Sequence, residues 1–228
     1  MNKKTVLITG ANRGIGFEFA KQYAEDGWDV FAGIRSDTKE LQNLIRHHNI
    51  TIVKLDLNNL QKCKENLHFF LSKPLHLLIN NAGVYGSNNQ SILDDLTEVD
   101  FFEVFQVNTI APFLLTQFLL PTLRKGDKII VNITSRMGSI EDNSSGGSYI
   151  YRASKAALNA VMKSMQIDLA EEGFKVLLLH PGSVKTDMGG KHALIEPEES
   201  VRNMRRIIEN AHQLENQFYH YQGDELPW

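Results

Sequence analysis

The feature that most constrains the fold is a regular alternation of short apolar runs with longer stretches of helical spacing. The runs are rich in Val, Ile and Leu and predict buried strands at residues 5–9, 29–34, 51–55, 75–79, 128–133, 175–179 and 218–221. The longest predicted helices are residues 101–123 and 149–172, and the last is 197–211. This alternation has no repeat, low-complexity tract or long linker. It predicts an α/β fold in one domain over residues 1–228, a doubly wound parallel sheet of about seven strands with helices on both faces.

The composition is that of a globular domain with a full core. Of the 228 residues, 42% are hydrophobic and 22% are charged, and the net charge of −3 gives no reason to expect a nucleic-acid partner. A basic cluster at Arg202, Arg205 and Arg206 has the spacing of a solvated helix face. Cys63 is the only cysteine, so no internal disulfide can form and a reducing compartment is expected.

No segment predicts a leader or a membrane span. Lys3 and Lys4 precede an apolar run, but that run is too short for the core of a signal peptide. The most apolar segment, residues 110–123, is shorter than the roughly 20 residues that cross a bilayer and is interrupted by Pro112 and Gln117. We therefore expect a cytoplasmic protein with no membrane partner.

A glycine-rich turn follows the first predicted strand. Glycines at such a turn let the backbone approach a diphosphate, which the N-terminus of the following helix attracts. Glycines also make ordinary tight turns, but the position directly after a strand favours the binding role. The candidate cofactor-binding residues of this turn are Gly10, Asn12, Arg13, Gly14, Ile15 and Gly16.

The end of the second predicted strand bears on the choice of dinucleotide. Ile34 and Arg35 stand where NAD-binding proteins usually carry a carboxylate for the ribose 2′-hydroxyl. Arg35 and Arg13 could instead form charge-assisted bonds to a 2′-phosphate. This pattern predicts NADP, as NADPH, as the cofactor. Two alternatives stay open: Arg35 could be a solvated loop residue, and Asp37 could reach a hydroxyl.

Further polar and small residues follow the predicted strands at their carboxyl ends, where ligands bind in doubly wound sheets. Asp56 is placed to accept from an adenine amino group, or else to cap the following helix. The run from Asn80 to Gly83 suits a backbone packed against a cofactor and suits an ordinary turn equally well. The candidate cofactor-binding residues at these ends are Asp56, Leu57, Asn81, Ala82, Gly83, Pro181 and Gly182.

Tyr151 and Lys155 carry the clearest sign of chemistry. They are four residues apart, so a helix places both side chains on one face. An ammonium near a phenol favours the phenolate, so we predict that Lys155 lowers the pKa of Tyr151 from about 10 and makes it a proton donor and acceptor. Taken alone, the pair also fits two surface neighbours on any helix. Ser135, after the fifth predicted strand, and Asn108, among apolar residues, are further candidates.

In this combination the chain resembles the short-chain dehydrogenase/reductase family. The shared motifs, in the family's order, are Thr9-Gly10-x-x-x-Gly14-x-Gly16, Asp56, Asn80-Asn81-Ala82-Gly83, Asn108, Ser135, Tyr151-x-x-x-Lys155 and Pro181-Gly182-x-x-x-Thr186. They span about residues 5–186. Each motif alone is modest evidence for the family, but the combination is specific. The resemblance implies a Rossmann-type sheet of seven strands.

The resemblance also implies a catalytic tetrad of Asn108, Ser135, Tyr151 and Lys155. Tyr151 would give a proton to a carbonyl oxygen as the nicotinamide delivers hydride, and Ser135 would hold that oxygen. Lys155 would bind the nicotinamide ribose and depress the pKa of Tyr151, and Asn108 would keep a water that relays protons to Lys155. The cofactor contacts would include Tyr151, Lys155, Val184 and Thr186, with Thr186 at the nicotinamide carboxamide. No metal is expected.

Within the family, the chain resembles the compact branch around C-factor and the carbonyl reductases of the sniffer type, through its runs Thr186-Asp-Met-Gly-Gly190, Pro197-Glu-Glu-Ser200 and Gly223-Asp-Glu-Leu-Pro-Trp228. This implies an NADPH-dependent oxidoreductase that reduces a small aldehyde, ketone or quinone-like substrate. The alternative is an NADP-bound regulatory or signalling protein of the C-factor type with incidental turnover.

The segment after Thr186 is short, so we expect an open and loosely selective pocket. A Met or an aromatic residue there could equally belong to the core. The candidate lining residues are Tyr85, Met137, Ser183, Val184 and Met188.

The two longest predicted helices indicate assembly, because they carry more apolar residues than one sheet face needs. The resemblance implies that this pair packs against its twofold mate, so we predict a homodimer or homotetramer. The alternative is that the apolar stripe is buried within its own subunit. The stripe comprises Phe102, Phe105, Phe113 and Phe118 on the first helix and Ala157, Val161 and Met165 on the second.

Overall fold

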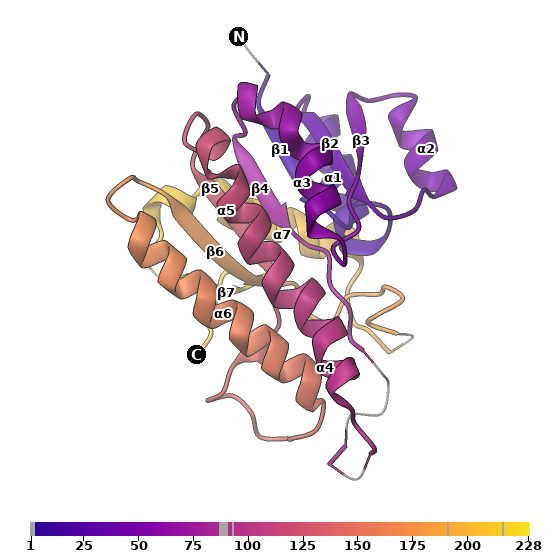
Figure 1. Cartoon of the computed structure of the whole chain (residues 1–228), viewed down its shortest axis with the longest axis vertical. Helices are drawn as coiled ribbons and strands as arrows, with labels where there is room; N and C mark the ends of the chain where they lie inside the picture. The colour runs from indigo at the N-terminus through magenta and orange to yellow at the C-terminus, as the bar shows by residue number, and fades with distance from the viewer. Residues whose placement is uncertain (1–2, 87–90, 93, 191, 216) are drawn as a thin grey trace.

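The structure, a computed structural model, describes residues 3–86, 91–92, 94–190, 192–215 and 217–228. Its centre is a parallel sheet of seven strands in the order β3-β2-β1-β4-β5-β6-β7, which confirms the predicted fold class (Figure 1). No strand boundary differs from the prediction by more than two residues. The strands are β1 (Thr5–Thr9), β2 (Asp29–Ile34), β3 (Ile50–Lys54), β4 (Leu77–Asn80), β5 (Ile129–Ile133), β6 (Lys175–His180) and β7 (Phe218–His220).

Strand β1, which lies between β2 and β4, is apolar on both of its faces. Its middle residues are fully buried, and Val6 lies opposite Val30 on β2 and Leu77 on β4. A strand without alternation is typical of a parallel sheet that helices cover on both sides. Because all seven strands are parallel, their carboxyl ends form one edge of the sheet, and the predicted site residues gather there.

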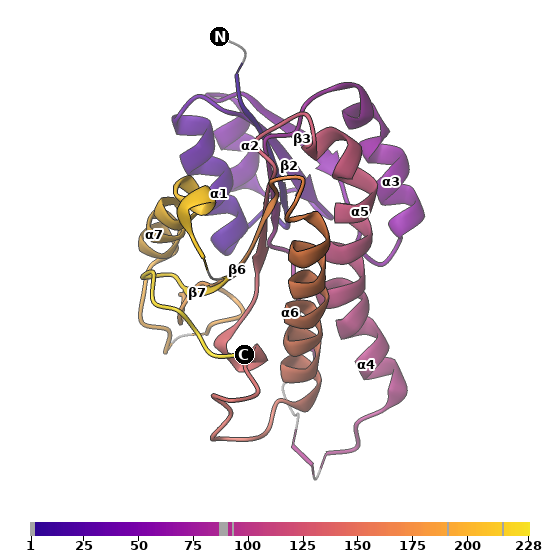
Figure 2. The ribbon, with the colours of Figure 1, turned by 90° about the vertical axis from the view of Figure 1, so that its left-hand side faces the viewer.

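Helices cover both faces of the sheet (Figure 2). Against one face lie α1 (Gly14–Glu25), α2 (Lys39–Ile45) and α7 (Pro197–Glu209), and against the other lie α3 (Leu60–Leu67), α5 (Ala111–Leu123) and α6 (Tyr149–Leu169). Each side has its own apolar core, with Phe19 and Met204 in the first and Leu119 and Met162 in the second. Burial of apolar surface, at about 25 cal/mol per Å², thus holds the sheet and its carboxyl edge from both sides.

The longest helical stretch is not one regular helix. It comprises α4 (Glu98–Phe105), a π-helical turn (Gln106–Ile110) and α5, whereas the sequence predicted a single helix over 101–123. Thr97 begins the stretch with a capping box, exchanging hydrogen bonds with Asp100. By length and composition the stretch could cross a membrane, but half of its apolar 18-residue window is buried in the protein, as in a core helix.

The outer surfaces of α4 and α6 carry exposed apolar side chains. Phe102 is 68% exposed and Ile167 is 65% exposed. The predicted stripe is wrong at Met165, which belongs to the core between α6 and the sheet. Five other members are half-buried: Phe105, Phe113, Phe118, Ala157 and Val161.

Candidate active site

Side chains tie the carboxyl ends of β1 and β4 together. The Thr9 hydroxyl oxygen accepts hydrogen bonds from the backbone nitrogens of Asn81 and Ala82, at 3.0 and 3.1 Å. The Asn81 side-chain amide donates to the carbonyl oxygens of Thr9 and Gly10, at 2.9 and 3.2 Å. The glycine turn and the segment after β4 therefore form one continuous surface.

The glycine turn has room for backbone only. Gly10 and Gly14 have φ angles of +68° and +54°, which favour glycine. A Cβ at Gly16 would lie 2.2 Å from the carbonyl oxygen of Gly10, so a larger residue does not fit. Arg13 is the N-cap residue of α1, but its side chain makes no capping hydrogen bond. The first amides of α1 are left for another acceptor, which fits the predicted diphosphate-binding role.

The chain beyond the glycine turn continues with the small residues Ala82 and Gly83. A Cβ at Gly83 would lie 3.3 Å from Asn108 Oδ1 and 3.5 Å from Lys155 Nζ. An elongated ligand that starts at α1 can therefore follow the backbone past Ala82 and Gly83 as far as the lysine. The residues present fit the dinucleotide that the family resemblance implies.

Positive charge lies at the ends of β1 and β2, where the sequence predicts an adenosine phosphate. Arg35 follows β2 and is exposed. Arg13 is exposed too, and its guanidinium pairs with the Asp187 carboxylate at 2.8 Å. Asp37, the alternative ribose ligand, has its carboxylate 3.5 Å from the Lys54 ammonium. This carboxylate therefore already has a cation beside it, and the region carries two arginines and a lysine.

The end of β3 is held by its neighbours. Asp56 is exposed, and its carboxylate accepts from the backbone nitrogen of Asn58 at 3.2 Å. The N-cap of α3 is Asn59, so the alternative that Asp56 caps this helix is wrong. Leu57 is buried, and its carbonyl oxygen accepts from the Gln106 side chain at 2.9 Å, which anchors the strand end to the π-helical turn.

The turn after β6 returns the chain to the glycine turn. The Ser200 hydroxyl of α7 donates to the carbonyl oxygen of Pro181 at 2.6 Å, and Gly182 has a φ of +82°. Thr186 then lies against α1, because its Cγ2 is 3.0 Å from where a Cβ of Gly14 would be. Thr186 thus borders the backbone path from α1 toward Lys155.

Ser135 and Tyr151 meet at the carboxyl edge. Ser135 follows β5, Tyr151 lies in the first turn of α6, and both are buried. Burial raises the pKa of Tyr151 to about 12, and the nearby Ser135 hydroxyl, which favours the phenolate, opposes this only in part. The prediction that the pKa of Tyr151 is lowered is therefore wrong in this structure, because desolvation of the phenolate outweighs the stabilising contacts.

Lys155 is buried one turn further along α6. Its ammonium donates to the carbonyl oxygen of Ile133 at 2.9 Å and lies 5.8 Å from the centre of the Tyr151 ring. Burial lowers the pKa of Lys155 to about 8. The lysine does share a face of α6 with the tyrosine, as predicted, but its hydrogen bond goes to β5.

Asn108 lies in the π-helical turn, a local departure from α-helix that is frequent at functional sites. The side chain is fully buried and bonds in three directions. Its oxygen accepts from the Val84 backbone nitrogen at 2.9 Å, and its nitrogen donates to the Val84 carbonyl oxygen at 2.8 Å and to the Ser154 hydroxyl at 3.0 Å. Asn108 therefore joins the long helix to the segment after β4 and to α6.

The proposed pocket residues differ in burial, and Tyr85 is in contact with Tyr151. The Tyr85 ring packs 4.7 Å from the Tyr151 ring, and its hydroxyl lies 2.6 Å from that of Ser148. Met137 is half-buried, whereas Val184 is buried and pairs with Ile195 in an isolated bridge. Ser183 and Met188 are exposed.

The sequence analysis assigned no role to several residues that organise the site. Thr9, which it named only as part of the glycine motif, binds the segment after β4, and Ser154 binds Asn108, as described above. The Thr38 hydroxyl donates to the Asn12 carbonyl oxygen at 2.9 Å and so joins the turns after β1 and β2. Gly138 packs on α6, since a Cβ there would lie 2.9 Å from the carbonyl carbon of Lys155. One signal was available: Ser154 is adjacent to Lys155 in the sequence and, three residues after Tyr151, lies on the same face of a helix as Tyr151.

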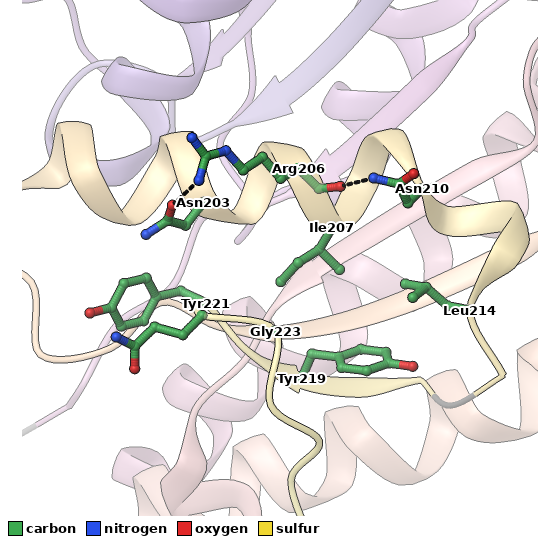
Figure 3. Close-up of a pocket in the computed structure, with 9 residues that line it drawn as sticks. Asn203, Arg206, Ile207, Asn210, Leu214, Tyr219, Tyr221 and Gly223 are labelled. Atoms are coloured by element: carbon green, nitrogen blue, oxygen red, sulfur yellow. Dashed lines mark hydrogen bonds between the residues drawn. The ribbon is translucent and has the colours of Figure 1, made fainter.

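A separate hollow of about 230 Å³ lies between α7 and the segment around β7 (Figure 3). None of the predicted site residues lines it, so it is not part of the candidate active site. Its lining residues are Asn203, Arg206, Ile207, Asn210, Leu214, Tyr219, Tyr221, Gln222 and Gly223.

Comparison with known proteins identifies the family and agrees with the fold. The family model described as short chain dehydrogenase matches residues 4–195. The C-signal of Myxococcus xanthus is 45% identical over 157 residues, which cover 68% of this chain and 93% of that protein. The carbonyl reductase Sniffer of D. melanogaster has a TM-score of 0.89 at 31% identity, and the NADPH-bound carbonyl reductase from chicken fatty liver has 0.86 at 33%, each covering 100% of both chains.

The chain therefore belongs to the short-chain dehydrogenase family, and the resemblance read from its motifs is confirmed.

Proposed function

We propose that the protein uses NADPH to reduce the carbonyl group of a small aldehyde, ketone or quinone-like compound. The observation that carries this proposal is that the neighbouring side chains of Ser135 and Tyr151 are both buried, with the buried Lys155 ammonium one helical turn from the tyrosine. Two neighbouring hydroxyls can both contact a single carbonyl oxygen between them, which is where negative charge develops during reduction.

Tyr151 acts as the proton donor. Its pKa of about 12 keeps the hydroxyl protonated throughout the neutral range, so it can give its proton to an oxygen that is becoming negative. Ser135 donates a hydrogen bond to the same oxygen and stabilises the charge before the proton arrives. The nicotinamide supplies the hydride when the cofactor is bound.

Lys155 and Asn108 prepare the site for this transfer. The Lys155 ammonium borders Gly83, where it would bind the hydroxyls of the nicotinamide ribose, and its charge favours the phenolate that proton transfer leaves on Tyr151. Asn108 holds Val84, next to Gly83, and the π-helical turn around Asn108 interrupts the regular helical bonding. That irregular backbone is a suitable place for a water that returns protons to Lys155.

NADPH rather than NADH is supported by the charges near the adenosine end. Arg13 and Arg35 are exposed arginines on the two turns that border this end, and the carboxylate of Asp37 is paired with Lys54. The carbonyl reductase from chicken fatty liver, 33% identical over the whole chain, is described as NADPH-bound. The remaining contacts would come from the glycine turn, Asp56, Leu57, Asn81 to Gly83, and Pro181 to Thr186.

Exposed apolar side chains on the loops after β5 and β6 support the proposed substrate class. Met188 and Leu194, on the short segment before α7, are 49% and 81% exposed, and Ile140, on the loop after Ser135, is 79% exposed. Exposed apolar side chains of this kind favour small, weakly polar carbonyl compounds of varied shape over one charged substrate. The neighbours described as carbonyl reductases agree with that class.

A second candidate function is signalling with bound cofactor. It is favoured by the 45% identity to a protein named C-signal. A protein that only bound cofactor would need the glycine turn but would have no use for the buried Ser135 and Tyr151 hydroxyls, so the reductase is preferred.

We also propose that the protein assembles through α4, α5 and α6 as a dimer or tetramer in the cytoplasm. The exposed apolar side chains at Phe102 and Ile167 support this assembly, because a monomer rarely leaves a large apolar patch in water. The lone buried Cys63 fits a reducing compartment.

The test of the proposed function is NADPH oxidation with a panel of aldehydes, ketones, diketones and quinones. The reductase requires turnover of at least one class, with NADPH preferred over NADH. If NADPH binds but no carbonyl compound is reduced, signalling becomes the preferred candidate function. If neither dinucleotide binds, the proposal is overturned.

A further inference from the structure

The end of the chain described here folds back onto the loop that follows Ser135. We call residues 223–228 the strap. After β7 the strap reverses and runs beside that strand, with Tyr219 and Glu225 in an antiparallel bridge and the Leu226 nitrogen donating to the Phe218 carbonyl oxygen at 2.9 Å. The strap thereby brings Trp228 to the catalytic end of the sheet, where the C label lies beside the loop after β5 (Figure 2).

The main-chain oxygen of Trp228 is the acceptor for three donors of that loop. It accepts from the backbone nitrogens of Ile140 and Glu141, at 3.1 and 2.9 Å, and from the Ser139 hydroxyl at 3.2 Å. Ser139 is 2% exposed, so its hydroxyl would be costly to leave unpaired. Its oxygen also accepts from the Asp142 nitrogen at 3.0 Å, which continues the order along the loop.

The Trp228 ring keeps that oxygen in place. The ring lies 5.8 Å from the ring of Phe218 on β7, and the Lys163 ammonium of α6 lies over it at 5.1 Å. A cation over an aromatic face and an aromatic pair both stabilise this position of the ring. The oxygen is therefore fixed relative to α6, the helix that carries Tyr151.

A short path of hydrogen bonds leads from the strap to the Ser135 side chain. The Ser139 nitrogen donates to the Arg136 carbonyl oxygen at 3.0 Å, and the Gly138 nitrogen donates to that of Ser135 at 2.9 Å. These bonds close the 3₁₀ turn Arg136–Gly138. The Ser135 hydroxyl oxygen caps the turn by accepting from the Met137 nitrogen at 3.1 Å, so the orientation of Ser135 depends on the turn.

We propose that Trp228 is a positioning residue: through Ser139 and the 3₁₀ turn it holds the Ser135 hydroxyl in the direction of the Tyr151 hydroxyl. The far end of the loop is tied separately, by the Arg152 guanidinium to Ser145 at 2.8 Å. The strap secures the near end, which carries Ser135. Misplacement of a catalytic group by about 1 Å can cost about a hundredfold in rate, so a loose turn would lower turnover without preventing folding.

This inference rests on the proposed function, and a double-mutant cycle separates the two. The chain ending at Pro227 and the Ser135→Ala variant are made singly and together, and carbonyl reduction is measured below the unfolding midpoints of all proteins. We expect truncation to lower kcat/KM about tenfold when Ser135 is present and less than about twofold when it is absent. NADPH affinity is expected to stay within about twofold, because the cofactor contacts lie elsewhere. The Trp228→Phe variant, which keeps the oxygen and an aromatic ring, is expected to restore most of the rate.

Hydrogen exchange gives a readout that does not depend on activity. The Ile140 and Glu141 amides are expected to exchange slowly in the full chain and fast in the truncated one, while Val131 and Leu177, in the sheet, stay protected in both. Ser139→Ala keeps the strap and removes one donor, so it replaces the truncation if the shorter chain does not fold. An equal loss with and without Ser135, or unchanged exchange at Ile140 and Glu141, overturns the inference. If Ser135→Ala alone leaves the rate unchanged, the proposed function fails while exchange still tests the strap.

Discussion

The Lys155 ammonium lies 2.9 Å from the carbonyl oxygen of Ile133, the last residue of β5, and donates a hydrogen bond to it. This bond joins α6, which carries Tyr151, to the strand that ends two residues before Ser135. The positions of the two catalytic hydroxyls are therefore fixed relative to one another by a buried cation. The cost is the desolvation of that cation, which lowers the pKa of Lys155 to about 8.

That cost predicts a pH dependence of stability. Between about pH 8 and the ordinary lysine value of 10.5, folded protein binds fewer protons at Lys155 than unfolded protein, so the free energy of unfolding rises with pH. The destabilisation is complete below about pH 8 and disappears above 10.5. Measured against Lys155→Met by urea unfolding, the stability difference should shift by about 3 kcal/mol in favour of the parent between about pH 7 and pH 10.5. The same difference at both pH values would contradict a buried, perturbed lysine.

The preference for NADPH over NADH tests the proposed roles of Arg13 and Arg35. Arg13→Ala and Arg35→Ala each remove a charge-assisted contact of about 1.5–3 kcal/mol, so NADPH affinity should fall about tenfold or more while NADH affinity barely changes. Together the two contacts give the parent a preference of about a hundredfold or more. Arg46→Ala, an exposed arginine beyond α2, is the matched control and should change neither affinity. A parent that binds NADH as tightly as NADPH would refute this assignment.

Gly83 separates cofactor binding from folding. Its φ is outside the left-handed region, so alanine is compatible with the backbone, and the new Cβ would be 3.3 Å from Asn108 Oδ1. We expect Gly83→Ala to change the free energy of unfolding by less than about 1 kcal/mol. NADPH affinity should nevertheless drop at least about tenfold, because the methyl group occupies the backbone path to Lys155. Fluorescence titration measures the NADPH affinity of the variant. An unchanged affinity would mean that the cofactor does not pass Gly83.

The molar mass of the protein in solution tests the proposed assembly. Each chain weighs 25.8 kDa, and light scattering at micromolar concentration should give two or four times that value. Phe102→Glu and Ile167→Glu place charges on the exposed apolar surfaces of α4 and α6 and should shift the mass toward the monomer. Leu194→Glu, at a residue that is even more exposed but lies on the segment before α7, should not. A parent mass of one chain would end the proposal.

Much of the architecture could be predicted because parallel strands leave a plain signal. Runs such as that of β1, with Val6, Leu7 and Ile8 in succession, lack polar alternation, and the motif residues that follow them must meet at one edge. The π-helical turn at Asn108 was missed because one extra residue in a turn barely disturbs helical spacing over a long apolar stretch.

The pKa values of buried groups and the contacts between distant segments could not be predicted from the sequence. The pKa of Tyr151 depends on how completely the fold removes it from water, and desolvation exceeded the effect of its partners. Met165 has the helical spacing of the residues that were predicted to face outward, yet its side chain packs in the core. Trp228 contacts Ser139 only when β7 and the strap are folded, and no spacing in the sequence predicts that contact.

The central claim is that Tyr151 gives the proton to the substrate oxygen. NADPH oxidation with the best carbonyl substrate of the panel, compared between the parent and Tyr151→Phe, tests it most directly. Tyr149→Phe, on the same turn of α6 but 41% exposed, is the control and should keep its rate. Removing the Tyr151 hydroxyl should lower kcat by about 10²–10⁴-fold while NADPH affinity stays within about twofold. A Tyr151→Phe variant that reduces the substrate within about threefold of the parent rate would contradict the account.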